Sequence, residues 1–127
     1  MAEAEIRSYR DLKVWQEAME LAERCYRATR HFPKSEMFGL VTQIRRAAAS
    51  VAANIAEGYG RESRGEYLQF LRVAQGSLKE LETYLLLAHR VGFLSESNLG
   101  HLLSMCEKVG KMLHRLIRSL QQFAKHR

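Results

Sequence analysis

Proline and cysteine are scarce in this chain of 127 residues, which contains one proline, Pro33, and two cysteines, Cys25 and Cys106. Because proline interrupts helices, its rarity leaves most of the chain free to form long ones. The cysteines form no Cys-x-x-Cys pair and each lies among apolar residues at helical spacing. We expect two buried free thiols, with a disulfide or a redox role as the alternative, and no zinc site.

Long apolar runs are also absent. No run approaches the ~20 residues that a helix needs to cross a bilayer, so we expect no membrane-spanning segment. The first nine residues carry acids where a secretory signal carries bases, and no apolar region follows them. The expected location is therefore the cytoplasm.

The sequence lacks the motifs that mark common catalytic sites. It contains no Glu-x-x-His, which the di-iron bundle enzymes place on inward faces, and no Gly-x-Ser-x-Gly, P-loop or dinucleotide fingerprint. The histidines have no metal-ligand spacing and stand at His31, His89, His101, His114 and His126. We therefore predict no enzyme, no catalytic residue, no metal and no cofactor.

Apolar residues recur at steps of three and four along four stretches, residues 11–31, 36–57, 64–91 and 96–122. This is the spacing of amphipathic helices, and short connections between helices make neighbours run antiparallel. We predict an all-α fold in which residues 1–127 form one antiparallel up-down-up-down four-helix bundle. The core-facing side of the first helix is predicted to carry Leu12, Trp15, Met19, Ala22, Tyr26 and Thr29.

Five residues are predicted to set the helix boundaries. Asp11 is expected to cap the first helix, and Pro33 to mark the turn that follows it. Ser35 is expected to cap the second helix. Gly58 is predicted to end that helix in the left-handed conformation, and Gly92 to stop the third.

The second helix also carries a polar stripe at helical spacing, formed by Gln43, Arg46, Ser50, Asn54 and Glu57. We interpret it as structural, with Arg46, Asn54 and Glu57 hydrogen-bonding across helices and to the turn at Gly58, which would fix the register of the bundle. Ligand binding is the alternative interpretation.

The second and third helices have apolar faces wider than one bundle core requires. The additional residues are Ala49, Ala53, Phe70, Val73, Tyr84 and Leu87. Two hypotheses account for them: a bundle with a broad core, or a homo-oligomer in which a second copy covers these faces.

The chain is basic, with a formal net charge of +6, which favours polyanionic partners. On the fourth helix a basic stripe is formed by Lys108, Lys111, Arg115 and Arg118. A second group, which we expect to gather near one end of the bundle, consists of Arg45, Arg61, Arg64 and Arg72. These residues are either a solvated cationic surface or a site for nucleic-acid phosphates, with Tyr59 and Tyr67 as candidate stacking residues.

Several segments resemble the S23 family, also called 23S rRNA intervening-sequence proteins. They are Asp11–Trp15, Phe32–Pro33, Phe38–Leu40, Gln43–Ala47, Ser50–Gly58 and Tyr67–Leu71, and the Asn-Ile-Ala-Glu-Gly run ending at Gly58 is the most distinctive. The resemblance implies a left-handed bundle, homo-oligomers with pentameric rings favoured, and no known enzymatic activity. Some members are encoded inside insertions of ribosomal RNA genes, and others resemble the accessory protein of diversity-generating retroelements, which works with a reverse transcriptase.

We therefore expect a non-enzymatic, oligomeric bundle whose partners are itself and either RNA or DNA or a nucleic-acid-processing protein. The alternative is a protein-interaction scaffold that binds no nucleic acid, in which the charge only keeps the chain soluble.

Overall fold

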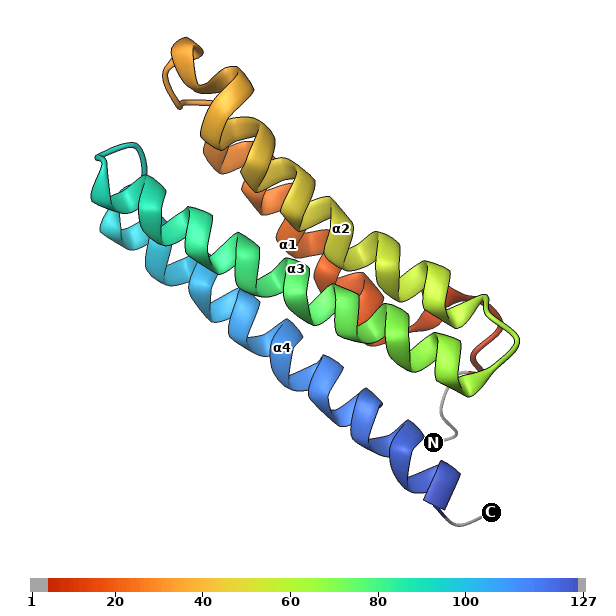
Figure 1. Ribbon diagram of the computed structural model, residues 1–127. Coiled ribbons are helices and arrows are strands. Elements are labelled where there is room, and N and C mark those ends of the chain that lie inside the picture. The colour runs from red at the N-terminus through yellow and green to blue at the C-terminus, as the bar shows by residue number, and fades with distance from the viewer. Residues whose placement is uncertain (1–4, 126–127) are drawn as a thin grey trace.

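The computed structural model describes residues 5–125, and within that range it contains four long α-helices and no strand (Figure 1). They are α1 (Lys13–Thr29), α2 (Thr42–Tyr59), α3 (Arg64–Arg90) and α4 (Glu96–Lys125). Figure 1 shows consecutive helices running in opposite directions, and α1 also contacts α4. The predicted four-helix bundle is confirmed. Among the described residues, no helix is long and apolar enough to cross a membrane.

Side chains from all four helices share one core. It includes Leu21 of α1, Ile44 and Ile55 of α2, Leu81 of α3 and Leu113 of α4, each with no exposed surface. Apolar side chains removed from water in this way are the main source of stability in a bundle of this kind. The core also positions the outer faces of the helices, where the candidate site lies.

The core-facing side predicted for α1 is confirmed at Ala22 and Thr29, and Leu12 and Trp15 pack against the core, but the prediction is wrong at two residues. The buried residues are Val14, Ala18, Leu21, Ala22, Cys25 and Thr29, whereas Met19 and Tyr26 are 45% and 44% exposed. Two apolar stripes lie side by side on this helix, and both have the spacing of three and four residues. The spacing therefore could not show which stripe faces the other helices.

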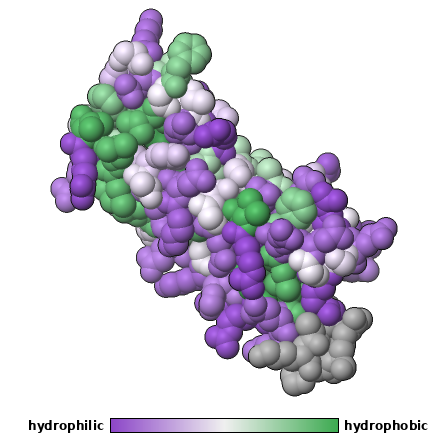
Figure 2. Space-filling model, in the orientation of Figure 1, coloured by the Kyte–Doolittle hydropathy of each residue, from purple (hydrophilic) through white to green (hydrophobic). Residues whose placement is uncertain are grey.

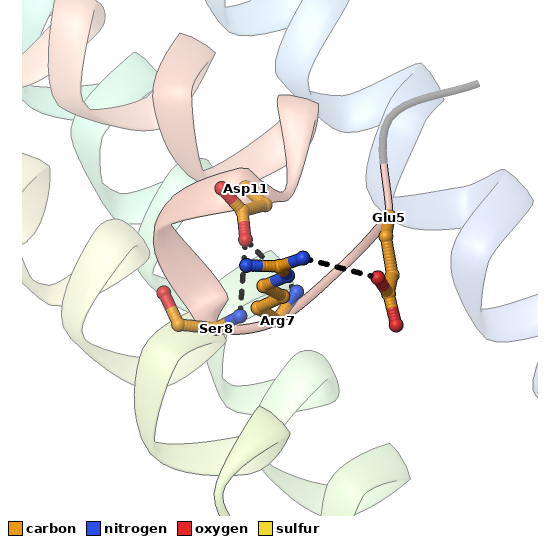
Figure 3. A network of polar contacts seen from close by, with 4 residues as sticks. All are labelled: Glu5, Arg7, Ser8 and Asp11. Atoms are coloured by element: carbon orange, nitrogen blue, oxygen red, sulfur yellow. Dashed lines mark hydrogen bonds and ion pairs between the residues drawn. The ribbon is translucent and has the colours of Figure 1, made fainter. Parts of the chain in front are cut away.

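The chain before α1 forms a short 3-10 turn, Tyr9–Asp11, that Asp11 closes (Figure 3). The Asp11 carboxylate accepts hydrogen bonds from the backbone amides of Arg7, at 2.9 Å, and Ser8, at 3.1 Å. The Ser8 hydroxyl accepts from the Arg10 amide at 3.1 Å. The prediction that Asp11 caps α1 is wrong, because its carboxylate is used by this preceding turn and α1 begins at Lys13.

The connection between α1 and α2 is longer than predicted. A 3-10 turn, Lys34–Glu36, follows Pro33. Before α2 comes a π-helical turn, Met37–Val41, which is kinked at Gly39, where the backbone is not helical (φ −109°, ψ −114°). Glu36, not Ser35, caps this π-helical turn, since its carboxylate accepts a hydrogen bond from the Leu40 amide at 3.4 Å. The second helix therefore begins at Thr42, six residues later than predicted.

Gly58 does not end α2 in the left-handed conformation. It is a buried residue of the helix, which continues to Tyr59. A β-carbon at this position would lie 2.9 Å from the Phe70 β-carbon and 3.2 Å from the backbone oxygen of Tyr67. Glycine is required there because α3 passes too close for any side chain. The glycine with a positive φ within residues 5–125 is Gly92, at 88°, which ends α3 as predicted.

Candidate nucleic-acid interface

A groove of about 930 Å³ runs along the outer surface between α3 and α4. We call it the α3–α4 groove. Its walls are formed by Gln75, Gly76, Lys79, Glu82 and Leu86 on α3, and by Leu103, Glu107, Gly110, Lys111, His114 and Arg115 on α4, with Leu78 and Cys106 also lining it. The span from Gln75 to Leu86 corresponds to about 16 Å of helix.

Two glycines leave the groove open. A β-carbon at Gly76 would have no atom within 4 Å, so the packing of the bundle does not require a glycine there. At Gly110 a β-carbon would lie 3.4 Å from the Leu78 side chain, which is an ordinary contact, so α4 faces α3 at this residue. The absence of side chains at both positions exposes the helix backbones to any molecule that occupies the groove.

Cations outnumber acids along the groove. Lys79 pairs with Glu82 at 3.0 Å, and Lys111 pairs with Glu107 at 3.2 Å. Both lysines are more than half exposed, and ion pairs in such positions contribute little to stability. Their ammonium groups can therefore exchange these carboxylates for another anion at low cost.

Three arginines at the end of the groove nearer the C-terminus of α4 have no ion pair among the described residues. Arg115 lines the groove, and Arg118 lies one turn further along the same face of α4. Arg72 lies one turn before Gln75 and Gly76 on the α3 wall. The ion pairs of the described residues include none of these three. The groove therefore has an end with unneutralised positive charge.

Lys108 separates from the other residues of the predicted α4 stripe. Its ammonium group binds the Glu17 carboxylate of α1 at 3.1 Å, which places it on the side of α4 that faces α1. Three of the four stripe residues, Lys111, Arg115 and Arg118, remain on the groove side.

The second predicted basic group does not gather at one end. Arg45 lies near the start of α2, where it donates hydrogen bonds to the Thr29 hydroxyl at 2.9 Å and to the Tyr26 carbonyl at 3.3 Å. Its guanidinium also lies 4.7 Å from the centre of the Tyr26 ring. Arg61 follows the other end of α2, about 24 Å away at 1.5 Å per residue. The proximity predicted for Arg45 is therefore wrong, and its role is to join α2 to α1.

Arg61 and Arg64 do lie close to each other in sequence at the turn between α2 and α3. Arg61 binds the Glu57 carboxylate at 2.7 Å and stacks over the Phe70 ring at 4.8 Å. Arg64 is the first residue of α3, is half-buried and is not free of partners. Neither residue lines the α3–α4 groove.

The polar stripe of α2 does contact another helix, but not through the residues predicted to do so. The Ser50 hydroxyl forms a 2.8 Å hydrogen bond with the Ser77 hydroxyl of α3. Asn54 donates to the Ser50 carbonyl at 2.8 Å and to its hydroxyl at 3.0 Å, while Arg46 donates to Gln43 at 2.5 Å, so both remain within α2. Serine is short enough to fit between two closely packed helices, whereas the longer side chains turn outward.

Tyr59 and Tyr67 are not free stacking residues. Their rings pack edge to face with centres 6.2 Å apart. Burial raises the pKa of Tyr67 to about 12, with a smaller contribution from Tyr59. The pair holds the α2–α3 turn against α3.

Both cysteines are buried free thiols, as predicted. Burial raises the pKa of Cys25 and that of Cys106 to about 12. Thiols in this state are poor nucleophiles at neutral pH. Among residues 5–125, no cluster of three or more His, Cys, Asp or Glu side chains is placed to hold a metal ion.

The sequence reasoning missed a second groove, of about 640 Å³, between α1 and α2. The α1 wall carries apolar side chains, including Met19 and Tyr26, together with three polar ones, and the α2 wall consists of small residues, including Ala49 and Ala53. We call it the α1–α2 groove. The signal was present in the sequence as a second apolar stripe on α1, which the prediction assigned to the core.

The fold and the site together define an all-α four-helix bundle with a basic groove on its surface. Residues 10–115 match the family of 23S rRNA-intervening sequence proteins, and the chain belongs to this family. A solved structure of a protein of unknown function from the S23 ribosomal protein family of Bacteroides thetaiotaomicron VPI-5482 has the same fold, with a TM-score of 0.77. The two sequences are 24% identical, over 83% of this chain and 95% of the other. None of the curated proteins matches this chain.

Proposed function

We propose that this protein is a non-enzymatic, cytoplasmic bundle that binds nucleic acid through the α3–α4 groove. The observation that carries the proposal is that Arg115 lines the groove with no ion pair among the described residues. Helical spacing puts Arg118 on α4 and Arg72 on α3 one turn beyond the lining at the same end, and neither has an ion pair there either. Unneutralised guanidinium groups attract phosphates, and their binding releases the counterions that had condensed on the nucleic acid. The name of the family, which refers to sequences that intervene in 23S rRNA, favours RNA as the polyanion.

Self-association is part of the same proposal. A second apolar stripe lies along one side of α3, with Val73 and Leu87 about half exposed, Phe70 and Tyr84 partly buried, and Val91 just after the helix. The α1–α2 groove lies on a different side of α2, so the stripe of one copy can enter the groove of the next in a head-to-tail contact. Such a contact closes into a ring when the rotation allows it, and the family resemblance favours five copies.

The charge of the groove can be tested by reversing two arginines. Arg115→Glu with Arg118→Glu should reduce the affinity for single-stranded RNA and lower the slope of log K against log salt by about 1.4, since each phosphate contact contributes about 0.7. Binding would be measured by fluorescence anisotropy at two salt concentrations, and the mass of the assembly by light scattering in the same buffers.

Arg24→Glu with Arg27→Glu is the matched control, because these α1 residues have the same spacing and the same effect on net charge but lie outside the groove. The proposal is wrong if both double variants weaken binding equally. If the folded wild-type protein binds no RNA or DNA at low salt, the alternative of a protein-interaction scaffold is favoured. A wild-type mass equal to one chain at micromolar concentration would rule out the proposed ring.

A further inference from the structure

Two turns meet at one end of the bundle, the α1–α2 connection and the α3–α4 turn. Phe32 of the first is buried and packs against Phe93 of the second, with ring centres 5.8 Å apart. We call the surface formed by these two turns, residues 30–41 and 90–96, the turn end. Figure 2 shows apolar side chains gathered there among hydrophilic ones. The contact between Phe32 and Phe93 makes the two turns a single surface.

The turn end exposes apolar side chains that the bundle could have buried. Phe38 is 94% exposed, and Met37 and Val91 are each about half exposed. A nearly free phenylalanine is unusual on the surface of a folded protein, because burying its ring is favourable. Phe38 touches too little of its own bundle to have a packing role.

The backbone that carries Phe38 is held on both sides. The Glu36 carboxylate accepts a hydrogen bond from the Leu40 amide at 3.4 Å, and the Thr42 hydroxyl donates one to the Met37 carbonyl. These bonds fix the π-helical turn Met37–Val41 against the start of α2. The ring is therefore presented to solvent by an anchored turn, which lowers the entropy lost when a partner covers it.

The two turns that form this surface also carry cations. Arg30, Lys34 and Arg90 stand at the turn end, and none has an ion pair among the described residues. The exposed His31 lies beside Arg30. Two acids belong to the same segments: Glu36, whose carboxylate binds the Leu40 amide, and Glu96 at the start of α4. An exposed aromatic ring with unpaired cations beside it is the arrangement that binds single-stranded nucleic acid, by stacking on a base and holding its phosphates.

We propose that Phe38 stacks on an unpaired base while Arg30, Lys34 and Arg90 bind the neighbouring phosphates, so that the protein prefers single-stranded nucleic acid to duplex. The inference rests on the proposed function and names the form of nucleic acid. The α3–α4 groove leads to this surface, because Leu86 at its end precedes Arg90 by one turn of α3. A lipid surface fits less well, since membrane-binding helices present a broad apolar face, whereas the turn end carries one free aromatic ring and two acids.

The test compares an oligothymidylate, the same strand with abasic sites, and a duplex of equal length, each labelled for anisotropy. Phe38→Ala should weaken binding of the oligothymidylate by about tenfold, as expected for loss of one base–aromatic stack, and leave duplex binding unchanged. The wild-type protein should bind the abasic strand about as weakly as Phe38→Ala binds the intact one.

In a Trp15→Phe background, Phe38→Trp should retain binding and show fluorescence quenching by the intact strand. Ile6→Ala, which removes another exposed apolar side chain, is the control and should bind like wild type.

The inference is overturned if Phe38→Ala binds the oligothymidylate as tightly as wild type, or if the abasic strand binds as tightly as the intact one, while the groove variants still lose binding. In that case the proposed function stands alone. If the wild-type protein binds none of the three probes, both proposals fail. Binding to anionic phosphatidylglycerol vesicles would be tested in the same way. If vesicle binding requires Phe38 and oligothymidylate binding does not, the ligand of Phe38 is a lipid surface and not a base.

Discussion

Gly58→Ala should destabilise the bundle, although alanine is the better helix former. In α2 the new β-carbon would meet the Phe70 β-carbon at 2.9 Å, a Tyr67 ring carbon at 3.0 Å and the Tyr67 backbone oxygen at 3.2 Å. A β-carbon cannot rotate away and neither can a backbone oxygen, so α3 must move. Overpacking of this kind costs about 1–3 kcal/mol, and the helix propensity of alanine recovers up to about 1 kcal/mol. We expect a net loss of about 1–2 kcal/mol in the free energy of unfolding.

Gly76→Ala is the matched control. It makes the same change inside α3, where no atom lies within 4 Å of the new β-carbon, so it should stabilise the protein by about 0.5–1 kcal/mol. Both variants would be melted at one fixed protein concentration, because association shifts the apparent stability. A difference of about 2 kcal/mol corresponds to about 8 °C in Tm for a chain of this size. Equal stabilisation by both substitutions would refute the close approach of α3 to Gly58.

Two further predictions concern the buried polar groups. Cys25 and Cys106 should resist a thiol reagent at neutral pH until the protein is unfolded. Burial raises both thiol pKa values from 9.0 to about 12, so between these values only the unfolded state loses the protons. The contribution of the thiols to the free energy of unfolding should therefore be fully present below pH 9 and fall as the pH rises towards 12. Urea unfolding across this range, compared with Cys106→Ala, checks the sign, and an unchanged midpoint would contradict it. In a double-mutant cycle, Ser50→Ala and Ser77→Ala should show a coupling of about 1 kcal/mol, the net value of a hydrogen bond, whereas additive effects would mean that the 2.8 Å contact contributes nothing.

The helices were predictable because their signals are local. The spacing of apolar residues placed all four helices, and it set the third within one residue of its observed end at Arg90. Pro33 and Gly92 act on their own backbone, through a fixed φ and a tolerance of positive φ, so their roles could be read without a partner. The start of α2 was misjudged because the bond from the Leu40 amide to Glu36 closes a π-helical turn that has no distinct apolar spacing.

The basic site was only partly predictable. The sequence placed Lys111, Arg115 and Arg118 on one face of α4, because helical spacing determines which residues of one helix lie together. It did not show that the groove side of α3, on which Arg72 lies, faces them, that Lys108 binds Glu17 of α1, or that Arg45 donates a hydrogen bond to Thr29 of α1. Those outcomes depend on which helices are neighbours and at what height they pass each other.

By itself, the sequence determined the number of helices, their approximate limits and the family to which the chain belongs, since all three depend on residues close together in the chain. Only the tertiary structure decided which of the two apolar stripes of α1 faces the core, why Gly58 must lack a side chain, and which cations share a groove. The physical reason is that a residue's spacing is a property of its own helix, whereas burial, close approach and shared charge are properties of two helices packed together.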